Sequence, residues 1–233
     1  MRSRLHTAEV TLLGNLDPRN ASDMLPALDA ADLSVIKASG WERVGIVAAL
    51  VDPEFRVLTL QHRPSGKSPA GALGPLAETG HVAKLGEDIV VETAGANLSR
   101  AIHEELGVDQ PSRLRLTARW LGAWTLNSWP VGIGYQAQHA LAICPVAHLD
   151  EAAKEMLMDT FTGTEEIEAI SFQSVDGLLA AENVRPGTHT WLGDIMSSGL
   201  MYTPATEREL VSLPEPSVMG GAVDIKFREI DYL

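Results

Sequence analysis

The chain has 233 residues, of which 45% are hydrophobic and 21% charged, which is enough apolar material for the core of one globular domain. Its net charge at pH 7 is −13, and we expect no nucleic-acid partner, because duplex binding needs a basic surface against the phosphates. The single cysteine excludes a disulfide framework. No run approaches the roughly 18 apolar residues of a membrane span, so we expect a cytoplasmic protein with no membrane partner.

Residues 1–43 form an N-terminal extension with signals for at most one extra strand and helix. We treat it as a candidate dimer arm, which would make the protein a homodimer. The first strong strand signal is Val44–Val51, a nearly continuous apolar run typical of a strand buried on both faces. Asp52 and Pro53 indicate a turn, and the alternating segment Arg56–Gln61 predicts a second strand, so the two strands form a hairpin.

Residues 64–80 are rich in proline and glycine and predict a long irregular loop of the kind that is often functional. The clearest helix follows at Thr93–Leu106, where Thr93 can cap the first turn and Gly107 occupies the C-terminal cap position. One apolar stripe runs along this helix, made by Leu98, Ile102 and Leu106.

The rest of the chain alternates strands with helices. We expect strands at Leu114–Leu126, Tyr135–Val146 and Ile167–Val175, helices at His148–Phe161 and Thr190–Leu200 with Thr190 as a cap, and an edge strand at Ala222–Ile230. Cys144 lies within an apolar run and is interpreted as a buried thiol rather than a nucleophile. These elements predict an α/β fold with a mixed sheet between helices, in which 44–210 form the domain and 211–233 a C-terminal tail.

The chemistry-bearing feature is the polar side of the helix at Thr93–Leu106. Arg100, Glu104 and Glu105 lie away from the apolar stripe, and residues three or four apart share a helical face. Neighbouring carboxylates on a rigid helix suit a hard cation such as Mg²⁺ or Mn²⁺. The alternative is a solvated charged face with no ligand, which is common on helices.

The spacing of this segment distinguishes the two interpretations. The stretch Gly86–Val108, GEDIVVETAGANLSRAIHEELGV, resembles the Nudix box, whose pattern is G-x5-E-x7-R-E-U-x-E-E-x-G-U with U aliphatic. The positions that match are Gly86, Glu92, Arg100, Ile102, Glu104, Glu105, Gly107 and Val108. The resemblance implies a Nudix-like α/β/α sandwich.

One position departs from the pattern, since Ala101 stands where the family has a glutamate directly after the arginine. In the family this glutamate and the one four residues later commonly share the divalent ion. Ala101 has no ligating atom, so one ligand is missing, and metal affinity and catalysis are both in question. Glu104 could take part of the role, and Glu78, Glu87 and Asp88 are further acids nearby in the sequence.

The resemblance implies hydrolysis of a diphosphate bond in a small nucleoside diphosphate derivative, with Mg²⁺ or Mn²⁺ as cofactor. Glu105 is then the first-choice metal ligand and Glu104 the second, while Glu92 and Arg100 orient the helix carboxylates. A further acid before the last strand commonly serves as general base in this family. Here the acids at that place are Glu165, Glu166 and Glu168, which are otherwise ordinary solvent-facing residues.

Substrate contacts have weaker signals. His62, Arg63 and Lys67 are placed to meet phosphates, or are plain surface groups, and Trp129 and Tyr135 could stack on a base or pack in the core. Two other functions stay open. The substrate could be a non-nucleotide diphosphate, or the domain could bind a phosphorylated ligand or partner without turnover, which only Ala101 favours.

Overall fold

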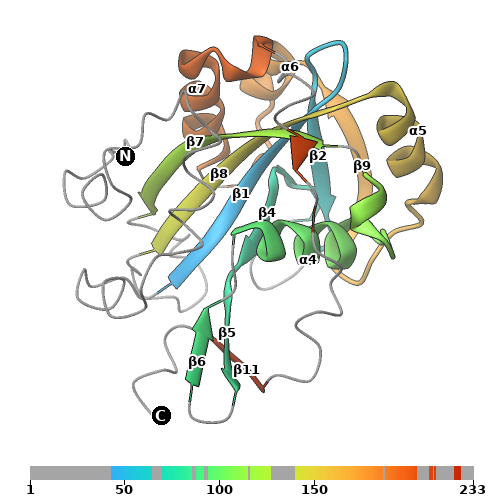
Figure 1. The fold of residues 1–233 in the computed structure, drawn as a ribbon. Coiled ribbons are helices and arrows are strands. Elements are labelled where there is room, and N and C mark those ends of the chain that lie inside the picture. Colours follow the sequence, from blue (N-terminus) through green and yellow to red (C-terminus); the bar gives the residue numbers. More distant parts are fainter. Residues whose placement is uncertain are drawn as a thin grey trace.

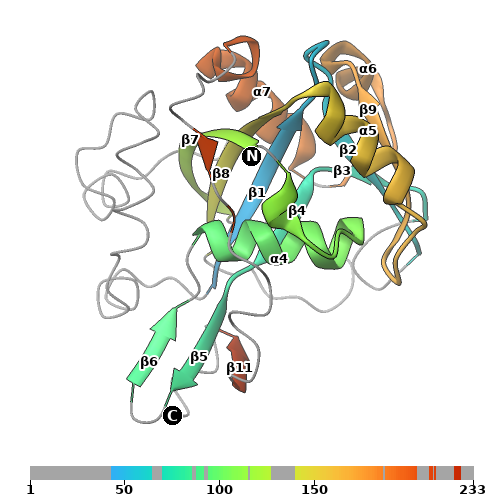
Figure 2. The same cartoon turned by 45° about the vertical axis from the view of Figure 1, so that its right-hand side comes forward.

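The computed structural model describes residues 43–64, 70–85, 88–91, 94–114, 116–126, 140–185, 187–203, 210–211, 213 and 223–226. In this part of the chain an eight-stranded sheet has the order β10-β7-β8-β1-β2-β3, with β4 paired to β1 and β9 to β2. A smaller sheet, β11-β5-β6, extends from one end of the molecule (Figures 1 and 2). No helix within the described ranges is long and apolar enough to cross a membrane.

The strands of the main sheet are β1 (Arg43–Val51), β2 (Val57–His62), β3 (Leu73–Gly74), β4 (Leu76–Thr79), β7 (Leu116–Leu126), β8 (Ala140–Leu149), β9 (Ile167–Gln173) and β10 (Leu210–Val211). The smaller sheet consists of β5 (His81–Leu85), β6 (Asp88–Val91) and β11 (Val223–Lys226). The helices are α4 (Ala94–Leu106), α5 (Glu151–Thr160), α6 (Val175–Ala180) and α7 (Thr188–Ser198), with short 3₁₀ turns η1 (Pro111–Arg113) and η2 (Leu200–Tyr202).

Strand β1 separates two hydrophobic cores, because successive side chains of a strand point to opposite faces. Ile46, Ala48 and Leu50 pack with α4 and α5 in one core, while Ala49 and Val51 pack with α6 and α7 in the other. Strand β1 pairs in parallel with β8 and antiparallel with β2 and β4, so the sheet is mixed. The predicted α/β fold, with a mixed sheet between helices, is confirmed.

The edge of β1 opposite β8 is shared by two strands. Near its start β1 pairs with β4, from Gly45 opposite Thr79 to Ala48 opposite Leu76, and at its end it pairs with β2, where Val51 lies opposite Val57. The close approach of β4 requires glycine at position 45, because a Cβ there would collide with the Glu78 carbonyl oxygen. The sheet therefore forks between β4 and β2, and α4 contacts β4 and β1 beside the fork (Figure 1).

Several predicted elements are confirmed with shifted ends. Helix α4 ends as expected at Leu106, and the following Gly107 has φ +69° and donates its N–H to the His103 carbonyl oxygen. The predicted hairpin of β1 and β2, the buried Cys144 and the apolar stripe of α4 are also present.

Other expectations were wrong in part. The predicted loop at 64–80 contains β3 and β4, whose two and four residues give little local signal and become strands only by pairing with β2 and β1. His148 lies in β8 rather than in a helix, since α5 begins after Asp150, whose carboxylate accepts the Ala153 N–H at 2.8 Å. Val175 starts α6 instead of ending a strand, because Ser174 caps that helix.

Thr190 does not cap α7, which begins at Thr188 after Gly187 in a left-handed conformation. The edge strand expected in the tail corresponds to β11, which pairs with β5. The extension 1–42 and the start of the strand expected at Tyr135–Val146 lie outside the described residues. The role of the extension as a dimer arm and the domain boundaries stay predictions.

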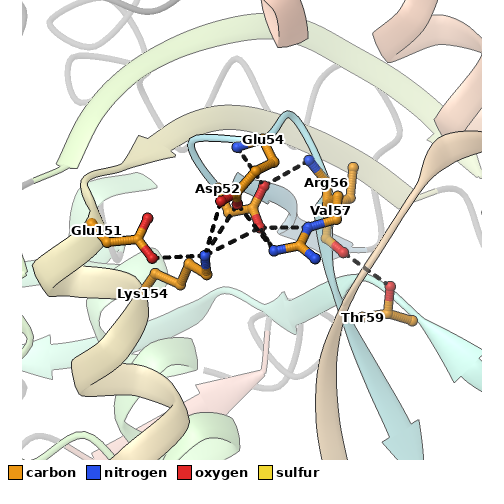
Figure 3. Close-up of polar contacts among 7 residues, drawn as sticks. All are labelled: Asp52, Glu54, Arg56, Val57, Thr59, Glu151 and Lys154. Atoms are coloured by element: carbon orange, nitrogen blue, oxygen red, sulfur yellow. Dashed lines mark hydrogen bonds and ion pairs between the residues drawn. The ribbon is translucent and has the colours of Figure 1, made fainter.

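The turn between β1 and β2 is organised by the buried carboxylate of Asp52, whose side chain is 0% exposed (Figure 3). It accepts the backbone N–H groups of Glu54 at 3.0 Å and Arg56 at 2.8 Å, and the Arg56 Nε–H at 2.8 Å. Lys154 of α5 bonds Glu54 at 3.1 Å and Glu151 at 2.9 Å, which ties the helix to the same turn. Asp52 thus holds a turn in which Phe55 has φ +59°.

We predict that Asp52→Asn lowers the free energy of unfolding by about 1–3 kcal/mol, because an amide cannot accept all of these donors and faces the Arg56 guanidinium with its own N–H. Urea denaturation at pH 7 measures the change. Asp109→Asn, at an exposed position, is the matched control and should leave the stability within about 0.5 kcal/mol of the parent. Equal stability of Asp52→Asn and the parent would contradict the role assigned to the turn.

Candidate active site

The candidate site is centred on Glu105, in the last turn of α4. Glu105 is only 9% exposed, although the residue next to it, Glu104, is exposed. Its Oε2 atom is buried and has no hydrogen-bond partner among the described residues. A buried carboxylate oxygen without a partner is energetically unfavourable, so this atom is suited to bind a proton or a cation.

Arg100 joins α4 to β4. Its guanidinium donates to the Thr79 carbonyl oxygen, lies 3.4 Å from the Glu78 carboxylate and bonds Glu104 at 3.0 Å. The Glu104 side chain is 49% exposed and points toward this arginine. Arg100 therefore bonds both Glu104 and β4, while its orienting role and the assignment of Glu104 as second metal ligand stay predictions.

Three further acids, Glu78, Glu166 and Glu104, contribute negative charge at Glu105. Burial is the largest cause that raises the pKa of Glu105 to about 7, and the charges of Glu78 and Glu166 come next. Burial also raises the pKa of Glu78, against the opposing charge of Arg100. The fork thus gathers acids from three separate segments, namely α4, β4 and the turn before β9, into one electrostatic cluster.

A cation from a fourth segment lies within electrostatic range of these acids. Arg185, in the connection between α6 and α7, interacts electrostatically with Glu105, Glu166 and Glu78. Its Nη1 lies 3.3 Å from Nε2 of His62. A guanidinium can only donate, so His62 must accept at Nε2 and carry its proton on Nδ1. Burial, aided by the charge of Arg185, lowers the pKa of His62 to about 4, so this ring is neutral at physiological pH.

The remaining sequence-predicted residues divide into two groups. Glu165 and Arg63 are exposed, and the Arg63 Nε–H bonds the Thr164 carbonyl oxygen at 3.1 Å. The second group lies outside the described residues and consists of Glu92, Lys67, Trp129 and Tyr135. The roles of both groups stay predictions.

Ala101 lies one turn before Glu105 and is 0% exposed, packed in the same core as Leu98, Ile102 and Leu106. Position 101 therefore faces the protein interior, and Glu105 lies at the border of that interior. Among the described residues, no three His, Cys, Asp or Glu side chains are arranged to hold a metal ion as they stand. A divalent cation fits the unpartnered oxygen of Glu105 and the local negative charge, but the neighbouring carboxylates would have to turn toward it.

Arg185 is the site residue that the sequence alone did not indicate. It lies 80 positions after Glu105 in the segment ENVRPG, which has no motif and no periodicity. The sequence indicates His62 and Glu78 only by their residue types and their place before the box. Strand pairing brings these residues together, and it leaves no trace in local spacing.

No family model matches the chain, and no curated protein matches it. Among solved structures it is similar to the Nudix domain of Shewanella oneidensis NrtR complexed with ADP ribose, with 13% identity and a TM-score of 0.45 over 83% of this chain and 99% of that one. It is also similar to RenU, a Nudix hydrolase from M. smegmatis, with 13% identity and a TM-score of 0.44 over 72% and 90% of the two chains. A third is a MutT protein from Methanosarcina mazei, with 12% identity and a TM-score of 0.42 over 68% and 94%. The solved structures that resemble this chain thus include Nudix proteins, at a similarity that says nothing about activity.

The raised pKa of Glu105 predicts a pH-dependent stability in the metal-free protein. Between pH 4.5, the ordinary value for a glutamate, and pH 7, the folded protein binds this proton more tightly than the unfolded chain does. The free energy of unfolding should therefore fall as pH rises through that window, by about 2–4 kcal/mol from this group. Denaturation with a chelator present at pH 4.5 and pH 8 tests this, and Glu105→Gln should lose most of the difference. If the free energy of unfolding changed with pH equally in the parent and in Glu105→Gln, the prediction would be wrong.

Proposed function

We propose that the protein hydrolyses a diphosphate bond in a small nucleoside diphosphate derivative with the aid of a divalent cation, Mg²⁺ or Mn²⁺. The observation that carries the proposal is the unpartnered, buried Glu105 oxygen on a helix whose spacing resembles the Nudix box. The acidic cluster supports it, because a cation would offset both the desolvation of Glu105 and the repulsion from Glu78 and Glu166.

In this proposal each residue of the cluster has a separate task. Glu105 holds the cation, and Arg100 keeps α4 against β4 through the Thr79 carbonyl oxygen. Of the three candidate bases, Glu165, Glu166 and Glu168, we assign the role to Glu166, which lies in an exposed turn, because its charge contributes to the raised pKa of Glu105. A bound divalent ion would polarise phosphoryl oxygens and lower the pKa of a coordinated water.

Two observations favour a second candidate function. Ala101 is buried in an apolar core, and no three-acid metal site is formed by the described residues. A domain with these properties could bind a phosphorylated ligand or partner without turnover. The cytoplasmic location, the homodimer and the absence of nucleic-acid and membrane partners accompany the proposal as untested expectations.

We predict that a panel of diphosphates, nucleotide and non-nucleotide, contains a substrate hydrolysed only with Mg²⁺ or Mn²⁺. Glu105→Gln should reduce that turnover at least about a hundredfold at saturating metal, because the isosteric amide removes the charge that binds the ion. Glu104→Gln is the matched comparison, with the same chemical change on an exposed neighbour, and should reduce turnover less while raising the metal concentration needed.

Phosphate release and metal titration measure both effects. Normal turnover in folded Glu105→Gln would refute the site, whereas binding of a panel compound without any hydrolysis would favour the second candidate function. A Glu104→Gln protein with the parent's metal midpoint would leave Glu104 as the partner of Arg100 alone.

Position 101 gives an independent prediction. Ala101→Glu should lower the stability of the metal-free protein by about 3 kcal/mol or more, because it places a carboxylate in an apolar core one turn from Glu105. Ala101→Gln has nearly the same size and no charge, so the difference between the two variants isolates the charge from the added volume. Mg²⁺ should restore part of the loss in Ala101→Glu only. Equal stability of the two variants, with and without metal, would place position 101 away from the cation.

A further inference from the structure

The acidic turn before β9, residues 163–167, is closed by its own backbone and one hydroxyl. The Thr164 N–H donates to the Ile167 carbonyl oxygen at 2.9 Å, and the Ile167 N–H donates to the Thr164 Oγ1 at 3.0 Å. Gly163 enters the turn with φ +91°, a conformation that residues with a Cβ rarely adopt. The turn therefore has a defined shape, and its two central residues, Glu165 and Glu166, are both exposed.

A bulge in β9 follows directly after the turn. The pairing register of β2 with β9 shifts between Gln61 and His62, which leaves Glu168 as an extra residue on β9. Ile167 and Ile170 are consequently buried in the same core although they are three residues apart. Bulges change the direction of a strand and re-aim the residues beside it, so the register shift sets where the acidic turn lies relative to β2.

Arg63, the residue that follows β2, contacts the turn at two of its carbonyl oxygens. Its backbone N–H donates to the Glu166 carbonyl oxygen at 2.8 Å, and its Nε–H donates to the Thr164 carbonyl oxygen at 3.1 Å. The guanidinium passes over Gly163, because a Cβ there would lie 3.3 Å from the Arg63 Nη2. Any residue other than proline could supply the backbone N–H at position 63, but the second bond needs a donor at the Nε position of the side chain.

We propose that Arg63 is a positioning residue whose Nε–H fixes the acidic turn, so that the Glu166 carboxylate meets the attacking water in one place. The inference rests on the proposed function in one respect, since it takes Glu166 to be the general base. A base must lie within hydrogen-bond reach of the proton it removes, and an exposed glutamate on an unfixed turn would spend most of its time elsewhere. Arg63 acts through the turn and is not required to touch the substrate.

Two substitutions at position 63 separate the hydrogen bond from the charge. Arg63→Gln removes the charge but has an amide nitrogen at the same place along the side chain as the arginine Nε, so it can still donate to the Thr164 carbonyl oxygen. Arg63→Met has the same chain length as glutamine and has neither the charge nor the donor. A role through the hydrogen bond predicts that Arg63→Gln resembles the parent more closely than Arg63→Met does, whereas a role through the charge predicts an equal loss in both.

The first measurement reports on the turn and does not depend on any activity. A glutamate-specific endoprotease can cut after Glu165 or Glu166 only when the turn opens, so the initial rate of cleavage there measures how firmly the turn is held. Cleavage should be at least about fivefold faster in Arg63→Met than in the parent, with Arg63→Gln between the two. Gly163→Ala, which presses a Cβ against Nη2 and strains the backbone, should also be cleaved faster. Arg113→Met removes an exposed arginine from η1 and is the matched control, with the parent's rate.

The second measurement is the turnover of a diphosphate that the parent hydrolyses. Arg63→Met should lower kcat about tenfold and leave KM within about twofold, because the substrate contacts are kept while the base is displaced. Arg63→Gln should recover most of that loss. In a Glu166→Gln background Arg63→Met should have no further effect, since a residue that acts through Glu166 loses its role with it. A merely structural role would lower kcat equally in both backgrounds.

The outcomes separate this inference from the proposed function. In a parent that hydrolyses a diphosphate, the role of Arg63 is overturned by equal cleavage of the parent and Arg63→Met, by faster cleavage without loss of kcat, or by normal turnover in Glu166→Gln, and the proposed function stands. A raised KM with unchanged kcat in Arg63→Met would show instead that Arg63 binds a substrate phosphate. A parent that hydrolyses no diphosphate overturns both.

Discussion

The structure depends on the way β1 divides one of its edges between β4 and β2. Both faces of β1 are covered by apolar cores, so neither face can receive polar groups. Its other edge is occupied by β8. The fork between β4 and β2 is consequently a place where charged side chains from separate segments can meet without entering a core, and the close approach of Gly45 to Glu78 allows it.

Glu105 lies at the border between the fork and the core. This position determines the pKa of its carboxyl group and its suitability to bind a cation. Burial raises the pKa of its carboxyl group, and the acids gathered from β4 and the β9 turn raise it further. The same arrangement that disfavours the metal-free ionised state favours a bound cation, because the desolvation and repulsion are already present in the folded protein. A functional site of this type is expected to cost stability at neutral pH.

Ala101 and Arg185 both make the site less negative than it would be with a glutamate at position 101 and no arginine at position 185. Glutamate at 101 would add a negative charge one turn from Glu105, whereas alanine there packs in the core. Arg185 adds a positive charge from the connection between α6 and α7. Both features reduce the net negative charge near Glu105. The chain therefore differs from the box pattern in charge balance while it keeps the helix that presents the acid.

The sequence by itself determined the elements whose signals are local: the apolar run of β1, the hairpin turn at Asp52, and the stripe and end of α4. It also determined that Arg100, Glu104 and Glu105 share one side of α4, because helical spacing alone decides that. The tertiary structure decided which of the two adjacent glutamates is buried, since both have the same local pattern and only packing against the fork distinguishes them. It also decided the presence of β3 and β4 and the approach of Arg185, which depend on pairing between distant segments and are not encoded in spacing along the chain.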